Sequence, residues 1–77
     1  MLTEAVAYLI KNIVDFPDDV SVKSHDSARG EHIRVRVNPE DIGRVIGRQG
    51  RTASAIRTVV QAISDHNVRV DIIDARR

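Results

Sequence analysis

Three glycines and the arginines beside them are the residues of this chain whose types and spacing best suit a specific chemistry. Gly43, Gly47 and Gly50 give a Gly-x-x-x-Gly-x-x-Gly spacing within residues 42–50. A dinucleotide fingerprint needs Gly-x-Gly-x-x-Gly after a strand, and a P-loop needs four residues between its glycines followed by Lys and Ser or Thr, so neither motif is present. A Gly-x-x-x-Gly contact between membrane helices requires apolar surroundings, which Arg44 and Arg48 do not provide.

The segment from Gly47 to Gly50 predicts instead a very short turn between two helices. Glycine adopts positive φ in such a turn and lets the backbone of a ligand approach closely. The second helix begins at about Arg51, so its free N–H groups favour phosphate oxygens. Arg48 adds positive charge, and Gln49 offers an amide for hydrogen bonding. Glycine at a helix end is often only a C-cap, but the order of elements and the local charge favour binding of a sugar-phosphate chain.

Positive charge is concentrated around these glycines. The net charge is only +1, yet residues 1–41 carry −3, residues 42–64 carry +4 and residues 65–77 carry zero. Ten of the twelve basic residues are arginine, whose planar guanidinium group suits phosphate recognition. The simplest explanation of these clustered arginines is a helix face exposed to solvent. The glycine turn beside them favours the other explanation, that they bind an anion.

Other residue types associated with catalysis or metal binding do not form a convincing site. Ser64-Asp65-His66 contains the residue types of a catalytic triad, but adjacent residues cannot face one another as a triad requires, so a helix end is expected there. His25 and His32, like His66, lack acidic partners at metal-ligand spacing and are expected on the surface. The chain has no cysteine. We therefore predict no enzyme activity, no metal and no cofactor.

The length and composition fit one folded domain spanning residues 1–77. Apolar residues make up 42% and charged residues 30% of the sequence, a balance typical of globular domains. There is no pattern of a signal peptide, and no run approaches the roughly 18 apolar residues of a membrane span. We expect a cytoplasmic protein.

Hydrophobic periodicity predicts three helices and three strands in the order α-β-β-α-α-β. The helices are expected at residues 2–14, 39–46 and 51–65, and the strands at 20–23, 33–37 and 68–72, with residues 24–30 as a hairpin loop. The second helix is expected to start with Asn38 as its N-cap and Pro39 at its first helical position. Because the strands alternate apolar and polar residues, we predict a two-layer α+β domain with helices on one face of a mixed sheet. The residues expected on the buried faces of the first and last helices are Leu2, Ala5, Val6, Leu9, Ile10, Ile13, Ala53, Ile56, Val59, Val60 and Ile63.

The run Val45-Ile46-Gly47-Arg48-Gln49-Gly50, followed by Ala53 and Ile56, resembles the signature of KH domains. The order of elements is similar to the type II, bacterial arrangement, and the size and the segment 39–44 are similar to stand-alone KhpA-type proteins. The resemblance implies that the loop contacts single-stranded RNA and that an apolar groove beside it holds bases. The RNA-binding residues that the resemblance implies are Gly47, Arg48, Gln49, Gly50, Ile42, Val45 and Ile46, and the last strand around 68–70 forms the other side of the groove. Arg44, Arg51 and Arg57 are added to the predicted site because of their charge.

Partners and alternatives follow from what the chain lacks. Tyr8 and Phe16 are the only aromatic residues, so base-stacking platforms are not expected and binding should be weak and sensitive to salt. The resemblance implies a homodimer or pairing with a larger KH protein of the KhpB or Jag type, and a role as an RNA chaperone or post-transcriptional regulator. The alternatives are single-stranded DNA binding and a protein-interaction module with little nucleic-acid binding, for which an apolar patch would come from Ala55, Ala62 and Ile73.

Overall fold

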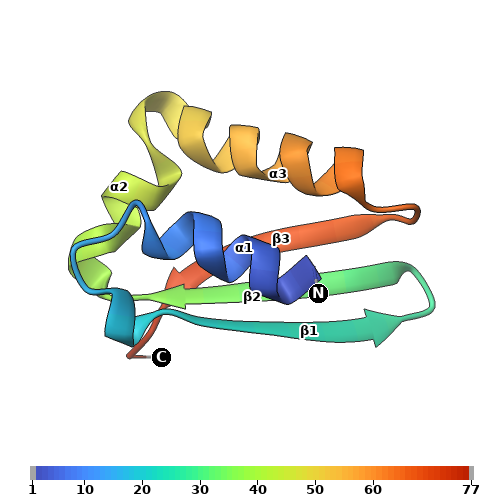
Figure 1. The fold of residues 1–77 in the computed structure, drawn as a ribbon, viewed down its shortest axis with the longest axis horizontal. Helices are drawn as coiled ribbons and strands as arrows, with labels where there is room; N and C mark the ends of the chain where they lie inside the picture. The colour runs from blue at the N-terminus through green and yellow to red at the C-terminus, as the bar shows by residue number, and fades with distance from the viewer. Residues whose placement is uncertain (1, 77) are drawn as a thin grey trace.

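A computed structural model describes residues 2–76 and shows a three-stranded sheet with helices on one face (Figure 1). The predicted α+β class and element order are confirmed. Short 3₁₀ turns lie at Pro17–Asp19, Pro39–Asp41 and Arg48–Gly50. The helices and strands are α1 (Leu2–Lys11), β1 (Ser21–Ser27), β2 (Gly30–Val37), α2 (Ile42–Ile46), α3 (Arg51–Ile63) and β3 (Val68–Asp74).

The sheet is mixed, with β2 in the centre. β1 pairs with β2 in antiparallel register, and β2 pairs with β3 in parallel register from Glu31 opposite Val68 onward. The parallel pair requires the crossover from β2 to β3, which passes through α2 and α3 above the sheet (Figure 1). The Gly47–Gly50 segment is the turn at the middle of this crossover.

The prediction of a hairpin loop over residues 24–30 was wrong. β1 continues to Ser27 and β2 begins at Gly30, so the turn contains two residues. The polar run from Ser24 to Ser27 is extended because ladder hydrogen bonds use the backbone, and its side chains are exposed. Gly30 has a φ of 125°, and a side chain there would collide with the carbonyl oxygen of Asn67.

The core lies between the sheet and the helices. Alternate residues of the central strand are completely buried at Ile33, Val35 and Val37. The side chains that cover them come from all three helices and from β3, and the buried ones are Val6, Ile10, Val45, Ala53, Ile56, Val60, Val68 and Val70.

Both long helices bury a narrower face than the sequence predicts. Leu9, Val59 and Ile63 are 37%, 45% and 59% exposed, because only three strands lie beneath the helices and the outer rows of side chains extend past the contact. α1 also ends at Lys11 and not at residue 14. The backbone N–H of Ile13 bonds to the carbonyl of Ile10, which tightens the chain into a turn after the helix.

Candidate nucleic-acid interface

The turn between α2 and α3 has a backbone that depends on its glycines. Gly47 has φ 78° and ψ 171°, and its N–H closes α2 by bonding to Gly43 O at 2.9 Å. Gln49 and Gly50 both have left-handed conformations, with φ of 58° and 74°. A left-handed Gln is uncommon and stores strain of the kind found at ligand sites.

Space around Gly47 is as restrictive as its dihedral angles. A Cβ on this residue would lie 2.7 Å from Thr52 Cβ and 2.8 Å from Thr52 N. The first turn of α3 therefore folds back against the loop, which requires a residue without a side chain. At Gly50 and Gly43 a Cβ would meet nothing within 4 Å.

The loop presents hydrogen-bond donors and charge to one place. Arg48 and Gln49 are exposed, and no side chain caps the N-terminus of α3, where Gly50 is the N-cap residue. The first N–H groups of α3 and the positive end of its dipole therefore lie beside the loop. Arg51 remains there as well, with its Nη2 3.5 Å from Gln49 Oε1.

The other two predicted arginines have partners away from the loop. Arg44 Nη1 lies 3.2 Å from Asp15 Oδ1, so part of its charge is compensated by an exposed ion pair. Arg57 extends from α3 to β3, where its Nε donates to Val70 O at 3.1 Å. Gln61, one turn further along α3, donates to Val68 O at 2.5 Å. Both side chains bond to carbonyls of the edge strand and hold β3 beside α3.

The predicted apolar groove needs one correction. Val45 is completely buried within the core, so it supports α2 from beneath and offers no surface to a base. Helical periodicity could not show that Val45 is buried while Ile42 and Ile46 are partly exposed, because α2 has only five residues. Ile46 is 38% exposed and Ile42 is partly buried. The hollow beside α2 and β3 is lined by Ile42, Ile72, Ile73 and Asp74.

A buried carboxylate that the sequence did not single out positions α2. Asp41 is 1% exposed, and its two oxygens accept the backbone N–H groups of Asp15 and Phe16, each at 3.1 Å. The predicted helix cap is present one turn earlier, where Asn38 Oδ1 accepts from Glu40 N at 2.8 Å. The chain between α1 and β1 is thus attached to the start of α2, which fixes where the loop begins.

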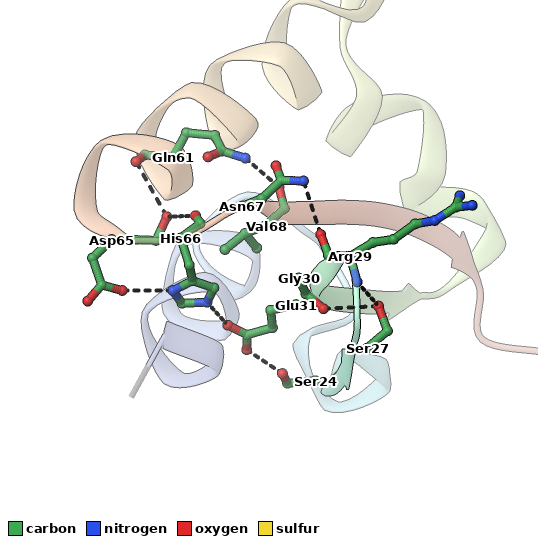
Figure 2. Close-up of polar contacts among 11 residues, drawn as sticks. Ser24, Ser27, Arg29, Gly30, Glu31, Gln61, Asp65, His66, Asn67 and Val68 are labelled. Atoms are coloured by element: carbon green, nitrogen blue, oxygen red, sulfur yellow. Dashed lines mark hydrogen bonds and ion pairs between the residues drawn. The ribbon is translucent and has the colours of Figure 1, made fainter.

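Two histidines have acidic partners in the folded chain, although His66 is exposed as the sequence predicts. His32 Nε2 is 2.5 Å from Asp71 Oδ2, across the sheet. His66 lies between two carboxylates, with Nε2 2.8 Å from Glu31 Oε1 and Nδ1 2.8 Å from Asp65 Oδ1 (Figure 2). In the chain between residues 2 and 76, no group of three or more acidic or histidine side chains could hold a metal ion.

These contacts shift the pKa values of the groups involved. Hydrogen bonds to Asp65 and Glu31 raise the pKa of His66 above its ordinary 6.5. A hydrogen bond from Ser24 and another from His66 lower the pKa of Glu31. Burial acts to raise the pKa of Asp71, but its hydrogen bond to His32 and the charge of Arg69 together lower it.

The cluster around His66 joins two distant segments at the end of the sheet far from the glycine loop (Figures 1 and 2). Glu31 N bonds to Asn67 O at 3.0 Å, and Asn67 Nδ2 donates to Arg29 O at 3.3 Å. The hairpin turn is therefore held against the connection between α3 and β3. This end of the molecule has a structural role in the sheet and lies outside the loop site.

Comparison with known proteins identifies the family. Residues 3–72 match a family model described as KhpA/KhpB, KH domain. The chain belongs to this family. RNA-binding protein KhpA of Leifsonia xyli is 59% identical over 75 residues, which cover 96% of this chain and 99% of that protein.

Other KhpA proteins match at similar coverage. The RNA-binding protein KhpA of Streptomyces coelicolor is 58% identical over 74 residues, covering 96% of this chain and 94% of that protein. The KhpA of Mycobacterium tuberculosis is 49% identical over 74 residues, covering 96% of this chain and 92% of that protein. No solved structure matches the chain. Within residues 2–76, the KhpA/KhpB fold contains no helix with the length and hydropathy to cross a membrane.

Proposed function

We propose that this member of the KhpA/KhpB family binds single-stranded RNA without catalysis. The observation that carries the proposal is the loop geometry, in which exposed Arg48 and Gln49 lie beside the uncapped start of α3. Such a site can bind successive phosphates through N–H groups and guanidinium charge. The relatives named RNA-binding proteins support RNA as the polyanion.

The bases of the bound strand would lie against α2 and β3. Ile42 and Ile46 offer aliphatic surface on α2, and the hollow next to them extends to Ile72 on β3. Aliphatic contact without aromatic stacking gives modest affinity, so phosphate contacts supply most of the binding free energy. A cytoplasmic role as an RNA chaperone or post-transcriptional regulator fits weak binding with little base readout.

Self-association, or pairing with a larger KH protein of the KhpB or Jag type, is part of the proposal because two weak sites gain by avidity. Large apolar side chains remain exposed on the outer sides of α1 and α3, namely Tyr8, Leu9, Val59 and Ile63. The patch expected from Ala55, Ala62 and Ile73 is not continuous, because Ile73 lies on β3 and turns away from the helices. Light scattering of the purified chain tests self-association.

The loop is tested by fluorescence anisotropy of a labelled single-stranded RNA at several salt concentrations. The variant Arg48→Asp with Gln49→Asp should lose binding while it remains folded by circular dichroism. A matched control changes the same net charge in the distant hairpin turn, by Ala28→Asp with Arg29→Asp, and should bind a short RNA of about 6 nucleotides normally. Equal binding by the loop variant and the wild type would exclude the loop as the RNA site.

The nature of the nucleic acid is tested in the same assay. The RNA and the single-stranded DNA of the same sequence differ chiefly by the 2′-hydroxyl group. The proposal expects tighter binding of the RNA. Equal affinity for both would make this chain a general single-strand binder.

A further inference from the structure

The face of the sheet that carries no helix is basic. Residues that alternate with the buried ones turn their side chains to this face, as the register of all three strands requires. Four of them carry positive charge at neutral pH, and Asp71 is the one acid among these alternating positions. The four basic residues are Lys23 on β1, Arg34 and Arg36 on β2, and Arg69 on β3, and we call them the sheet-face cluster.

One contact within the sheet-face cluster opposes stability, although Arg34 also lies opposite Asp71 on β3. Lys23 and Arg34 are direct cross-strand partners, and like charges in that position are destabilising. Arg36 follows on the same face of β2, about 7 Å along the strand. The chain has eleven acidic residues for twelve basic ones, so this grouping is not a consequence of a general excess of positive charge. Local arrangements that cost stability are concentrated at functional sites.

The nearby acid offsets only part of the positive charge of the cluster. Asp71 is already engaged by His32 at 2.5 Å and by Arg69 at 3.6 Å. Among residues 2–76, Lys23, Arg34 and Arg36 form no ion pair. Lys23 and Arg34 are also exposed. Their charges therefore face solvent and remain available to an anion.

Two hollows along the free edge of β3 link the helix side of this strand with the basic face. The first hollow is lined by residues from both sides of the strand, including Arg57 and Val70 on the helix side and Arg69 on the other. A second hollow continues from Arg69 to His32, Arg29 and Ser27. A strand of nucleic acid that leaves the groove past Arg57 can thus turn around the edge of the sheet and reach Arg34.

We propose that the sheet-face cluster is a second RNA contact, which binds the sugar-phosphate backbone of a strand whose other part occupies the loop and groove. This inference rests on the proposed function. The face has no Phe, Tyr or Trp, and its rings are those of the cross-strand partners His25 and His32. Most of its charge comes from cationic side chains, which bind phosphates without reading sequence. An acidic protein is a poorer fit, because protein interfaces are anchored by central apolar or aromatic side chains and this face has Ile73 alone.

The test compares a short RNA of about 6 nucleotides, which fills the loop and groove, with an RNA of about 24 nucleotides that can reach both surfaces. The variant Lys23→Gln with Arg34→Gln removes two charges from the sheet face. Lys11→Glu is the control, since it changes net charge equally at the end of α1. Melting temperatures confirm that all the proteins are folded. The face variant removes the like-charge pair of Lys23 and Arg34 and also the arginine opposite Asp71, so its stability should change little.

Wild type and face variant should bind the short RNA equally. For the long RNA, the face variant should bind roughly tenfold more weakly near 0.1 M salt. The slope of log affinity against log salt should become shallower by about 1.4, which is about 0.7 for each phosphate that the variant no longer neutralises. The affinity of the Lys11→Glu control should fall much less.

The remaining outcomes separate this inference from the proposed function. If the face variant and the wild type bind the long RNA with equal affinity and slope, the sheet-face contact is excluded while the loop assignment stands. An equal loss in the face variant and the Lys11→Glu control excludes it too, because net charge alone would then explain the effect. A wild type that binds neither RNA overturns both proposals. Loss of long-RNA binding in the face variant alone, with the Arg48→Asp, Gln49→Asp variant unaffected, supports the sheet face and excludes the loop.

Discussion

Gly47 shows how a single residue controls the loop. Its φ of 78° disfavours any side chain, and Thr52 occupies the space that a Cβ would need. Replacement by alanine must therefore shift either the loop or the first turn of α3. The same substitution at Gly43, a helical position with open space around it, encounters neither constraint.

We expect Gly47→Ala to lower the free energy of unfolding by about 1–3 kcal/mol and to weaken RNA binding. Gly43→Ala is the matched control and should be neutral or stabilise the fold by up to about 1 kcal/mol, because alanine is the better helix former. Urea denaturation measures both. Equal stability of the two variants would contradict the close approach of Thr52 to the loop.

His66 provides a prediction about pH. Its pKa is raised, so its contribution to stability is complete below its ordinary pKa of 6.5 and is lost as pH rises through the raised value. The pKa values of Glu31 and Asp65 are lowered, so their contributions are complete above their ordinary values of 4.5 and 3.8 and are lost as pH falls further. The cluster therefore stabilises the fold most between pH 4.5 and 6.5.

The variant His66→Gln should consequently lose more stability at about pH 5.5 than at about pH 8.5. Denaturant titrations of wild type and variant at the two pH values give the comparison. A difference in unfolding free energy that does not change with pH would show that the ionised His66 contributes nothing to the join between the hairpin and β3.

At the scale of elements, Asp41 connects three of them. Its carboxylate holds the chain that leads from α1 to β1, while its backbone begins α2. Removing the carboxylate leaves the N–H groups of Asp15 and Phe16 without their acceptor. Because hydrogen bonds to a charged group contribute about 1.5–3 kcal/mol, and unpaired buried groups cost more, this residue stabilises the entry to the loop.

Asp41→Ala should therefore lower the unfolding free energy by about 2–4 kcal/mol. Asp41→Asn retains one acceptor oxygen and should lose about half as much. Thermal unfolding followed by circular dichroism distinguishes the two variants. If both equal the wild type, water replaces the carboxylate and the attachment of α2 has another cause.

The sequence predicted the elements better than their contacts. Alternation along residues 33–37 and 68–72, and the Asn38-Pro39 start, were sufficient for the order and the mixed sheet. The prediction of the hairpin loop was wrong because residues 24–27 pair with β2 through their backbone groups. The polarity of the side chains gives no information about this pairing. The burial of Val45 and the contact of His66 with Glu31 depend on segments far apart in the chain, so periodicity and local spacing could not reveal them.

The loop is the part of the candidate site for which the sequence was most informative. Gly47 and Gly50 do have positive φ, and the next helix does begin at Arg51. The left-handed Gln49 was not foreseen, since glutamine has no special preference for that conformation. Arg57 was grouped with the loop because of its charge, whereas helical geometry directs it toward Val70.

For the molecule as a whole, size limits stability. At roughly 0.05–0.15 kcal/mol per residue, a chain of 77 residues has about 4–12 kcal/mol of folding free energy. The core has one layer of apolar side chains between helices and sheet, centred on Ile33 in the middle strand. The free energy lost by opening one large cavity in that layer is therefore a substantial fraction of the whole folding free energy.

We expect Ile33→Ala to cost about 2–5 kcal/mol, enough to unfold a large share of the molecules near physiological temperature. Ile33→Val removes one methylene group and should cost only about 0.5–1.5 kcal/mol. The denaturant concentrations at the unfolding midpoints, analysed with one common slope of free energy against denaturant concentration, give both losses of stability. A small loss for alanine would mean that the layers close over the cavity.

The crossover between β2 and β3 has a further consequence, for the kinetics of folding. β1 and β2 are joined by a two-residue turn, whereas Glu31 meets Val68 only after the whole intervening chain has closed. Hairpins form within microseconds, but pairings between distant residues are slow because closure entropy precedes any gain from contact. The glycine loop lies at the middle of the segment that must close. We therefore expect residues 38–67 to govern the refolding rate, so that selection on the binding loop also acts on how quickly the sheet is completed.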